Sequence, residues 1–123
     1  MGLSQFKQTS IRIEGDPIHN SAEAVVTPGV EQTLISYLVP VGKVHNLHQV
    51  VLSCRVTGSF RVEIDGSLMG SGRTGVASPN SSMSFVPTLS LSEGTLVEVK
   101  YCSAAGSLLQ RVEAYAQAAE TDS

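Results

Sequence analysis

The sequence predicts an all-β domain, an antiparallel β-sandwich of jelly-roll type with about eight to ten short strands. Apolar and polar residues alternate in runs of strand length, and clusters of glycine, proline, serine and asparagine separate these runs. The five prolines, at positions 17, 28, 40, 79 and 87, lie between the alternating runs, where a missing amide proton removes no ladder hydrogen bond. Between the runs there is no helical pattern of convincing length.

Four strands are expected in the first half of the chain. In order, they cover residues 9–14, 21–27, 33–39 and 44–56. The last run is the longest, and we expect it to bend or split near Asn46. Its expected inward set is Val44, His48, Val50, Leu52, Cys54 and Val56. The expected outward set is Lys43, His45, Gln49, Ser53 and Arg55.

A hairpin begins the second half. Phe60, Val62 and Ile64 occupy one face of the first strand, and charged residues occupy the other. Asp65-Gly66 then supplies the two residues that tolerate positive φ in a type I′ turn. Further strands are expected at residues 83–86, 89–91, 96–102 and 108–116.

The chain is long enough for one domain with a real core. We expect an N-terminal arm at residues 1–8, a single sandwich domain at residues 9–117 and a flexible C-terminal tail at residues 118–123. The net charge is −3, and the eight lysines and arginines are scattered singly, which argues against nucleic-acid binding. There is no apolar run of signal-peptide or membrane-spanning length, so no membrane partner is expected and cytoplasmic synthesis is the default.

Candidate metal ligands and nucleophiles are few. His45 and His48 are three residues apart, so a regular strand sends them to opposite faces, and they cannot share an ion unless the strand contains a bulge. His48 is expected to be a core imidazole or a subunit contact. Cys54 is expected to point inward and Cys102 outward, which favours free thiols over a disulfide. His48 with Cys54 lacks an orienting Asp or Asn for nucleophilic catalysis.

Two further patterns suggest chemistry only superficially. Gly70, Gly72 and Gly75 match the spacing of a dinucleotide-binding loop, but the following Val76-Ala77-Ser78-Pro79-Asn80 cannot open the helix that such a loop needs. A flexible strand end or bulge is the better interpretation. Glu63 and Asp65 alternate to an exposed face, where carboxylates usually serve solubility. We therefore expect no catalytic, cofactor-binding or metal-binding residues.

Contact with other proteins is the remaining possibility. Aromatic side chains outside the core alternation suit subunit contacts, and an exposed hairpin turn suits a partner. The residues expected to contact partners are Phe6, Tyr37, His45, Asp65, Gly66, Arg73 and Tyr115.

The second half of the chain, roughly residues 44 to 117, resembles a small β-sandwich that recurs in virions of tailed bacteriophages. The resemblance rests on the strand and Asp-Gly hairpin at residues 60–68, the Arg-Thr turn at residues 72–74, the run Leu-Ser-Glu-Gly-Thr-Leu-Val-Glu-Val at residues 91–99 and the final Val-Glu-Ala-Tyr at residues 112–115. Asn80 and Phe85 also fit the pattern.

Within that group the chain is most similar to capsid decoration, or cement, proteins. The resemblance implies a non-enzymatic virion protein, made in the host cytoplasm, that binds the major capsid protein and copies of itself, with a trimer favoured. A tail, baseplate or fibre module that contacts tail proteins or a host surface glycan is the alternative. A small hydrolase using His48 and Cys54 is a third possibility.

Overall fold

Eight antiparallel strands form a sandwich of two four-stranded sheets, as the sequence predicts. The computed structural model describes residues 15–106 and 109–123. The strands are β1 (Asp16–Val26), β2 (Gln32–Leu38), β3 (Lys43–Ser53), β4 (Gly58–Ile64), β5 (Ser67–Thr74), β6 (Asn80–Leu91), β7 (Leu96–Ser103) and β8 (Gln110–Asp122). In this part of the chain, no helix is long and apolar enough to cross a membrane.

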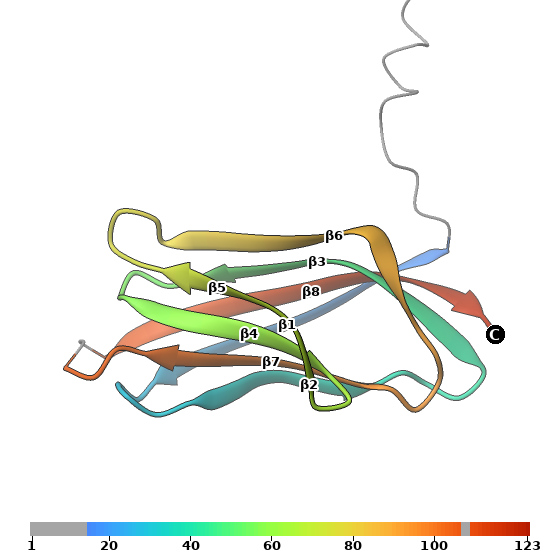
Figure 1. The fold of residues 1–123 in the computed structure, drawn as a ribbon, viewed down its shortest axis with the longest axis horizontal. Helices are drawn as coiled ribbons and strands as arrows, with labels where there is room; N and C mark the ends of the chain where they lie inside the picture. Colours follow the sequence, from blue (N-terminus) through green and yellow to red (C-terminus); the bar gives the residue numbers. More distant parts are fainter. Residues whose placement is uncertain (1–14, 107–108) are drawn as a thin grey trace, which may run out of the picture.

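The strand order identifies a jelly roll. One sheet has the order β1-β8-β3-β6 and the other has the order β2-β7-β4-β5. The first strand thus pairs with the last, the second with the seventh, the third with the sixth and the fourth with the fifth. The four connections β1–β2, β3–β4, β5–β6 and β7–β8 lie at one end of the sandwich, on the left of Figure 1. The C-terminus lies at the other end.

The core lies between the inner faces of the two sheets. Phe60 and Tyr101 are its largest fully buried side chains, and valines and leucines fill most of the rest. The inner face of β8 carries Val112 and then alanines at positions 114, 116 and 118, all of them buried. Small side chains on β8 leave room for the larger side chains of the facing sheet.

The glycine run of the hairpin has a packing role. Phe60 pairs across the β4–β5 ladder with Gly72, and a Cβ at Gly72 would overlap the Phe60 ring. A Cβ at Gly70 would likewise overlap the side chain of Met83 on β6. These glycines let the ring and the neighbouring edge strand approach the β5 backbone closely. Gly70 and Gly72 thus lie inside β5 and not at a strand end. The register of β4 and β5 shifts beside Gly70, so the bulge alternative is the one confirmed.

The expected inward set of β3 is wrong before residue 49. His45 and Leu47 are buried, whereas Val44 and His48 are only half-buried. The register with both neighbouring strands shifts between Leu47 and Gln49, which marks a β-bulge at His48. An extra residue in one strand reverses the alternation of faces, so odd positions point inward before the bulge and even positions after it.

The expected positions of two prolines are also wrong. Pro17 lies within β1, and Pro87 lies within β6, which joins the two short runs expected at residues 83–86 and 89–91. Both strands are edges of the β1-β8-β3-β6 sheet. An edge strand has one side without ladder partners, so a proline there can be accommodated without removing a ladder hydrogen bond.

The chain end does not form the expected flexible tail, because β8 continues to Asp122. Ala118 and Ala119 are buried, and Asp122 forms an ion pair of 2.6 Å with Lys43 on β3. Alternate residues of β8 from position 112 to position 118 are buried on the core face, and this burial holds the end of β8 in the sheet. The expected arm at residues 1–8 and the strand at residues 9–14 lie outside the described residues, as does Leu108, the expected start of the last strand.

We predict that Gly72→Ala lowers the free energy of unfolding by about 1–3 kcal/mol, because the new methyl group displaces the buried Phe60 ring. Urea denaturation measures the difference. Gly75→Ala is the matched control: no atom lies within 4 Å of its added Cβ, so its stability should stay within about 0.5 kcal/mol of the parent chain. Equal stability of the two variants would contradict the packing role of Gly72.

Candidate interaction surfaces

The four connections at one end of the sandwich are hydrogen-bonded to one another. Backbone amides of three connections donate to carbonyls of another connection or of a strand end. The bonds are Gly29 N to Ser103 O at 2.9 Å, Cys54 N to Pro79 O at 2.8 Å and Ala104 N to Thr57 O at 2.8 Å. The described residues of these turns are therefore joined to one another by backbone hydrogen bonds.

A cluster of buried polar groups lies next to these connections. The hydroxyl of Thr74 donates to the carbonyl of Val56 at 2.9 Å, so the hydroxyl of Tyr101 is left to donate to Thr74 Oγ1 at 2.8 Å. Gly58 packs directly against the Tyr101 hydroxyl, where a Cβ would overlap it. The cluster joins β5, β7 and the β3–β4 connection through buried polar atoms that are hydrogen-bonded to one another.

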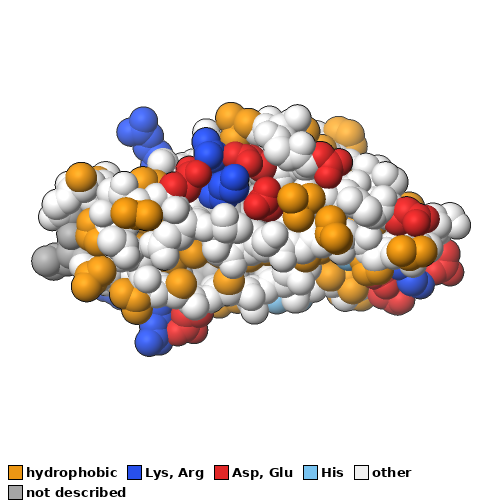
Figure 2. Space-filling model, turned by 90° about the horizontal axis from the view of Figure 1, so that it is seen from below, with side chains coloured by type: hydrophobic (Ala, Val, Ile, Leu, Met, Phe, Trp, Pro, Cys, Tyr) orange, Lys and Arg blue, Asp and Glu red, His pale blue; other side chains and the backbone are white. Residues whose placement is uncertain are grey.

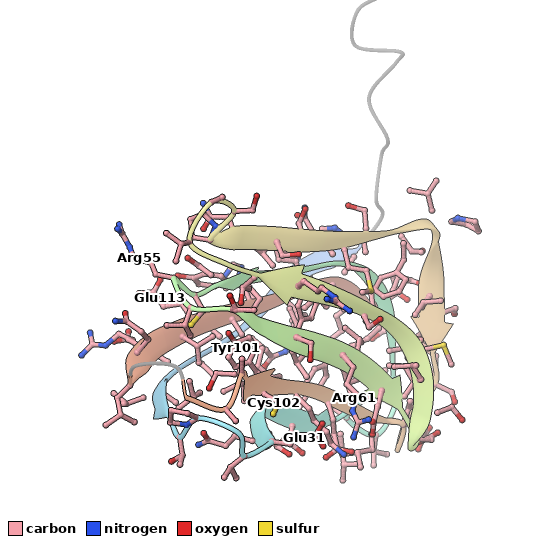
Figure 3. The ribbon with its side chains drawn as sticks, turned by 60° about the vertical axis from the view of Figure 1, so that its left-hand side comes forward. Glu31, Arg55, Arg61, Tyr101, Cys102 and Glu113 are labelled. Atoms are coloured by element: carbon pink, nitrogen blue, oxygen red, sulfur yellow. The ribbon has the colours of Figure 1, made fainter. Side chains whose placement is uncertain are left out.

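Apolar side chains project from this ordered end. Val30 is 51% exposed, Val76 is 83% exposed and Leu109 is 64% exposed. They come from the β1–β2, β5–β6 and β7–β8 connections, and we call this set the loop surface. Arg55, from the β3–β4 connection, is exposed and points away from the body of the protein (Figure 3). Exposed apolar side chains on these connections are candidates for a protein contact. Leu38, Val41, Leu68 and Met69 are also exposed, towards the opposite end.

The opposite end has a different character. Figure 2 shows hydrophobic side chains along the whole of this face, at both ends, whereas acidic side chains lie mainly from the middle to the right. Asp65 and Gly66 form the hairpin tip there, with φ values of 50° and 81°, which confirms the predicted type I′ turn. The Asp65 carboxylate accepts a hydrogen bond from Leu96 N at 2.8 Å, so it already serves to hold the tip against β7.

Two of the expected contact residues form a mostly buried cluster beside the acidic end. His45 is 2% exposed, and its Nε2 lies 2.8 Å from Oε2 of Glu120. Tyr37 is half-buried, and its ring centre lies 5.7 Å from that of His45. Burial raises the pKa of Tyr37 to about 12. The expectation that His45 faces outward is wrong, because the bulge at His48 turns it inward.

The other expected contact residues lie far from one another in the fold. Arg73 is exposed on the outer face of the β2-β7-β4-β5 sheet. Tyr115 lies on the outer face of the other sheet, with its ring centre 5.3 Å from that of His19. Phe6 is outside the described residues. The structure therefore does not bring the expected contact residues together into one site.

Glu63 belongs to an ion-pair network on the outer face of the β2-β7-β4-β5 sheet. It lies 2.9 Å from Nε of Arg61 and 3.0 Å from Nζ of Lys100. Arg61 also pairs with Glu31 at 2.7 Å, and Figure 3 shows these two side chains close together. The expectation that Glu63 is an exposed carboxylate is wrong, since its cationic neighbours cover it.

The candidate catalytic pairs are not assembled. Cys54 is buried in the core, whereas His48 lies at the bulge of β3, six residues earlier. Six residues of extended chain span about 20 Å, so the two side chains are far apart. Both cysteines are free, Cys54 buried and Cys102 half-buried, as the alternation predicts. Among residues 15–106 and 109–123, no three metal-ligating side chains gather at one point.

The sequence prediction missed the loop surface. Val30 and Val76 stand in turn segments, outside every expected strand. Leu109 falls within the strand expected at residues 108–116, but it lies in the connection before β8. An apolar residue next to a turn such as Pro28-Gly29 or Gly75 has no position in the core. Such a residue could therefore have been recognised in the sequence as an exposed one. Their convergence depends on the jelly-roll connections, which local patterns do not determine.

Comparison with known proteins finds a likeness in fold. No protein-family model and no curated protein sequence matches the chain. A chain in the acid-stable capsid structure of Helicobacter pylori bacteriophage KHP30 is similar, with a TM-score of 0.51, 11% identity, and coverage of 90% of this chain and 97% of that chain. The two chains thus share one fold over nearly their whole lengths.

Two structures of infectious bursal disease virus are more distant. The Gt strain structure gives a TM-score of 0.40 at 14% identity, covering 84% of this chain and 32% of that chain. The Gx strain structure gives 0.39 at 12% identity, covering 88% and 30%.

We predict that the protein loses stability as the pH rises from about 10 to about 12. Burial raises the pKa of Tyr101, like that of Tyr37, to about 12, whereas an unfolded tyrosine ionises near 10. The stabilisation is complete below pH 10 and falls above it, because only the unfolded chain releases these protons.

Denaturation at several alkaline pH values, with tyrosinate absorbance, measures this loss. Tyr101→Phe should reduce the pH dependence, since one of the two buried hydroxyls is gone. A free energy of unfolding that stays constant up to pH 12 would contradict the burial of both phenols.

Proposed function

We propose that the chain is a non-enzymatic structural protein of a bacteriophage virion, a capsid decoration protein that binds the assembled head and stabilises it. The observation that carries the proposal is the full-length likeness in fold to a chain of a phage capsid structure. A single sandwich of similar length accounts for nearly all of both chains, so the likeness does not rest on a shared fragment. The resemblance of residues 44–117 to phage decoration proteins supports the same class independently.

Surface properties support attachment through contact rather than chemistry. The loop surface presents Val30, Val76 and Leu109 on turns that are already hydrogen-bonded to one another. A pre-ordered apolar surface loses little conformational entropy on binding. We propose that it contacts the major capsid protein, and that Arg55 at its rim adds a charged hydrogen-bond donor.

Oligomerisation increases the strength of such an attachment. One loop surface is small, but several copies held together bind a repeating lattice with a much higher effective concentration than a single copy. We propose a homotrimer, with the exposed Arg73 and Gly66 and the half-buried Tyr115 as candidate contacts between copies or with neighbouring virion proteins.

We predict that the protein co-sediments with expanded capsids of the phage that encodes it, and that Val76→Asp together with Leu109→Asp reduces the bound fraction by about tenfold or more. Two charges placed in an apolar contact must be desolvated without partners. Val41→Asp is the matched control, because Val41 is 86% exposed at the opposite end. Equal loss in both variants would place the contact elsewhere, and binding to isolated tails instead of heads would favour the tail alternative.

We also predict that light scattering gives the mass of three chains for the purified protein, against 13.0 kDa for one. A trimer is a closed, symmetric assembly that suits a site where capsid subunits meet. The measurement is made across a range of protein concentrations. A monomer that also fails to bind capsids would overturn the decoration hypothesis.

A further inference from the structure

A polar groove lies on the outer face of the β2-β7-β4-β5 sheet. It has a volume of about 350 Å³, and its lining residues are Glu31, Ser59, Phe60, Arg61, Ser71, Gly72 and Arg73. Across the β4–β5 ladder, Ser59 pairs with Arg73. The next outward pair is Arg61 with Ser71. Phe60, between the two β4 positions, is buried, so these four side chains project together from the outer face.

Arg61 is held in a defined orientation at this groove. Its Nη2 lies 2.7 Å from Oε1 of Glu31, and its Nε lies 2.9 Å from Oε2 of Glu63. Glu63 is in turn held by Lys100, whose Nζ lies 3.0 Å from Oε1. These contacts use Nη2 and Nε, so the Nη1 hydrogens of Arg61 are left to donate to a ligand. A guanidinium that its neighbours already fix loses little conformational entropy on binding.

Arg73 supplies a second guanidinium group to the groove. It is exposed on β5, and no carboxylate in the described part of the chain forms an ion pair with it. The carboxylate of Glu31, which also lines the groove, is already paired with Arg61. Guanidinium groups bind carboxylates through two parallel hydrogen bonds. The two arginines therefore indicate an anionic group on the ligand.

The other lining groups suit hydroxyls on the same ligand. Ser59 and Ser71 can each donate and accept a hydrogen bond, and Glu31 has further lone pairs that accept. That carboxylate would repel a compact dianion such as phosphate. Phe60 is the one aromatic lining residue, and at 2% exposure it offers no ring face for stacking. A ligand with one negative charge and several hydroxyl groups matches this set.

A second hollow continues the groove towards the loop end of the sandwich. Its volume is also about 350 Å³, and it shares Ser59 and Arg73 with the groove. Its other lining residues are Gly29, Thr57, Gly58, Cys102, Ser103, Ala104 and Ala105. Arg73 thus lies where two hollows meet, each of the size of a small-ligand site. Together they have room for more than one sugar unit.

We propose that this groove binds an acidic saccharide. The carboxylate of one sugar contacts the guanidinium groups of Arg73 and Arg61, and its hydroxyls contact Ser59, Ser71 and Glu31. The neighbouring sugar unit lies in the second hollow. No residue of the loop surface lines either hollow, so the inference does not depend on the proposed virion role.

Titration of the isotope-labelled protein with sialyllactose and with trigalacturonic acid, followed by NMR, tests the site. An acidic saccharide should shift the amide signals of Ser59, Arg61, Ser71 and Arg73. Lactose and maltotriose, the neutral counterparts, should leave these signals unchanged. Sodium sulfate, the control for a simple anion, should bind at least about tenfold more weakly, because it makes none of the hydroxyl contacts. No shift with either acidic saccharide would overturn the proposal, and so would equal binding of sulfate or of a neutral sugar.

Substitutions at Arg73 test the charge contact. Arg73→Gln should weaken the binding of the acidic saccharide by about tenfold or more, whereas Arg73→Lys, which keeps the charge, should retain part of the affinity. Arg111→Gln is the matched control, because Arg111 is exposed on the outer face of the other sheet, and its affinity should equal that of the parent chain. Thermal unfolding of each variant checks that the sandwich is intact. Equal affinity of Arg73→Gln and the parent chain would overturn the proposal.

Discussion

One extra residue in β3 determines which side chains this strand gives to the core. The bulge at His48 turns His45 and Leu47 inward on one side and Val50 and Leu52 inward on the other. β3 is a central strand, paired with β8 and β6, so its register governs three of the four strands of the sheet. Without the extra residue, half of the strand would present its apolar side chains to solvent.

The same bulge links the interior of the sheet to its surface. By turning His45 inward, it allows the contact with Glu120 that holds the end of β8, and thereby the point where the chain enters β1. It also places His48 in the lining of a surface pocket, beside the four residues of β6 that lie between Ser84 and Leu89. Core packing and this surface pocket therefore depend on one backbone irregularity.

Much of the fold was predictable because its signals are local. The Asp65-Gly66 turn, the alternation through Phe60–Ile64 and the outward direction of Cys102 follow from residues that are neighbours in sequence. The irregularity of β3 was expected near Asn46, two residues from the bulge at His48. Its exact position was not predictable, because apolar residues occur at both parities between Val44 and Leu52 and only the pairing with β8 and β6 selects one register. The loop surface was missed for a related reason: its members are distant in sequence and lie at the same end of the sandwich only because of the jelly-roll connections.

The prolines of the edge strands have a consequence for a protein that exists in many copies. Pro17 in β1 and Pro87 in β6 interrupt the free backbone of both edges of one sheet, and such edges resist the addition of a foreign strand. In the other sheet, both edge strands, β2 and β5, lack proline, and β2 carries Leu34, Ile35 and Tyr37 in close succession. Misassembly between crowded copies before they reach their final positions would therefore begin at β2, whose backbone lacks this protection.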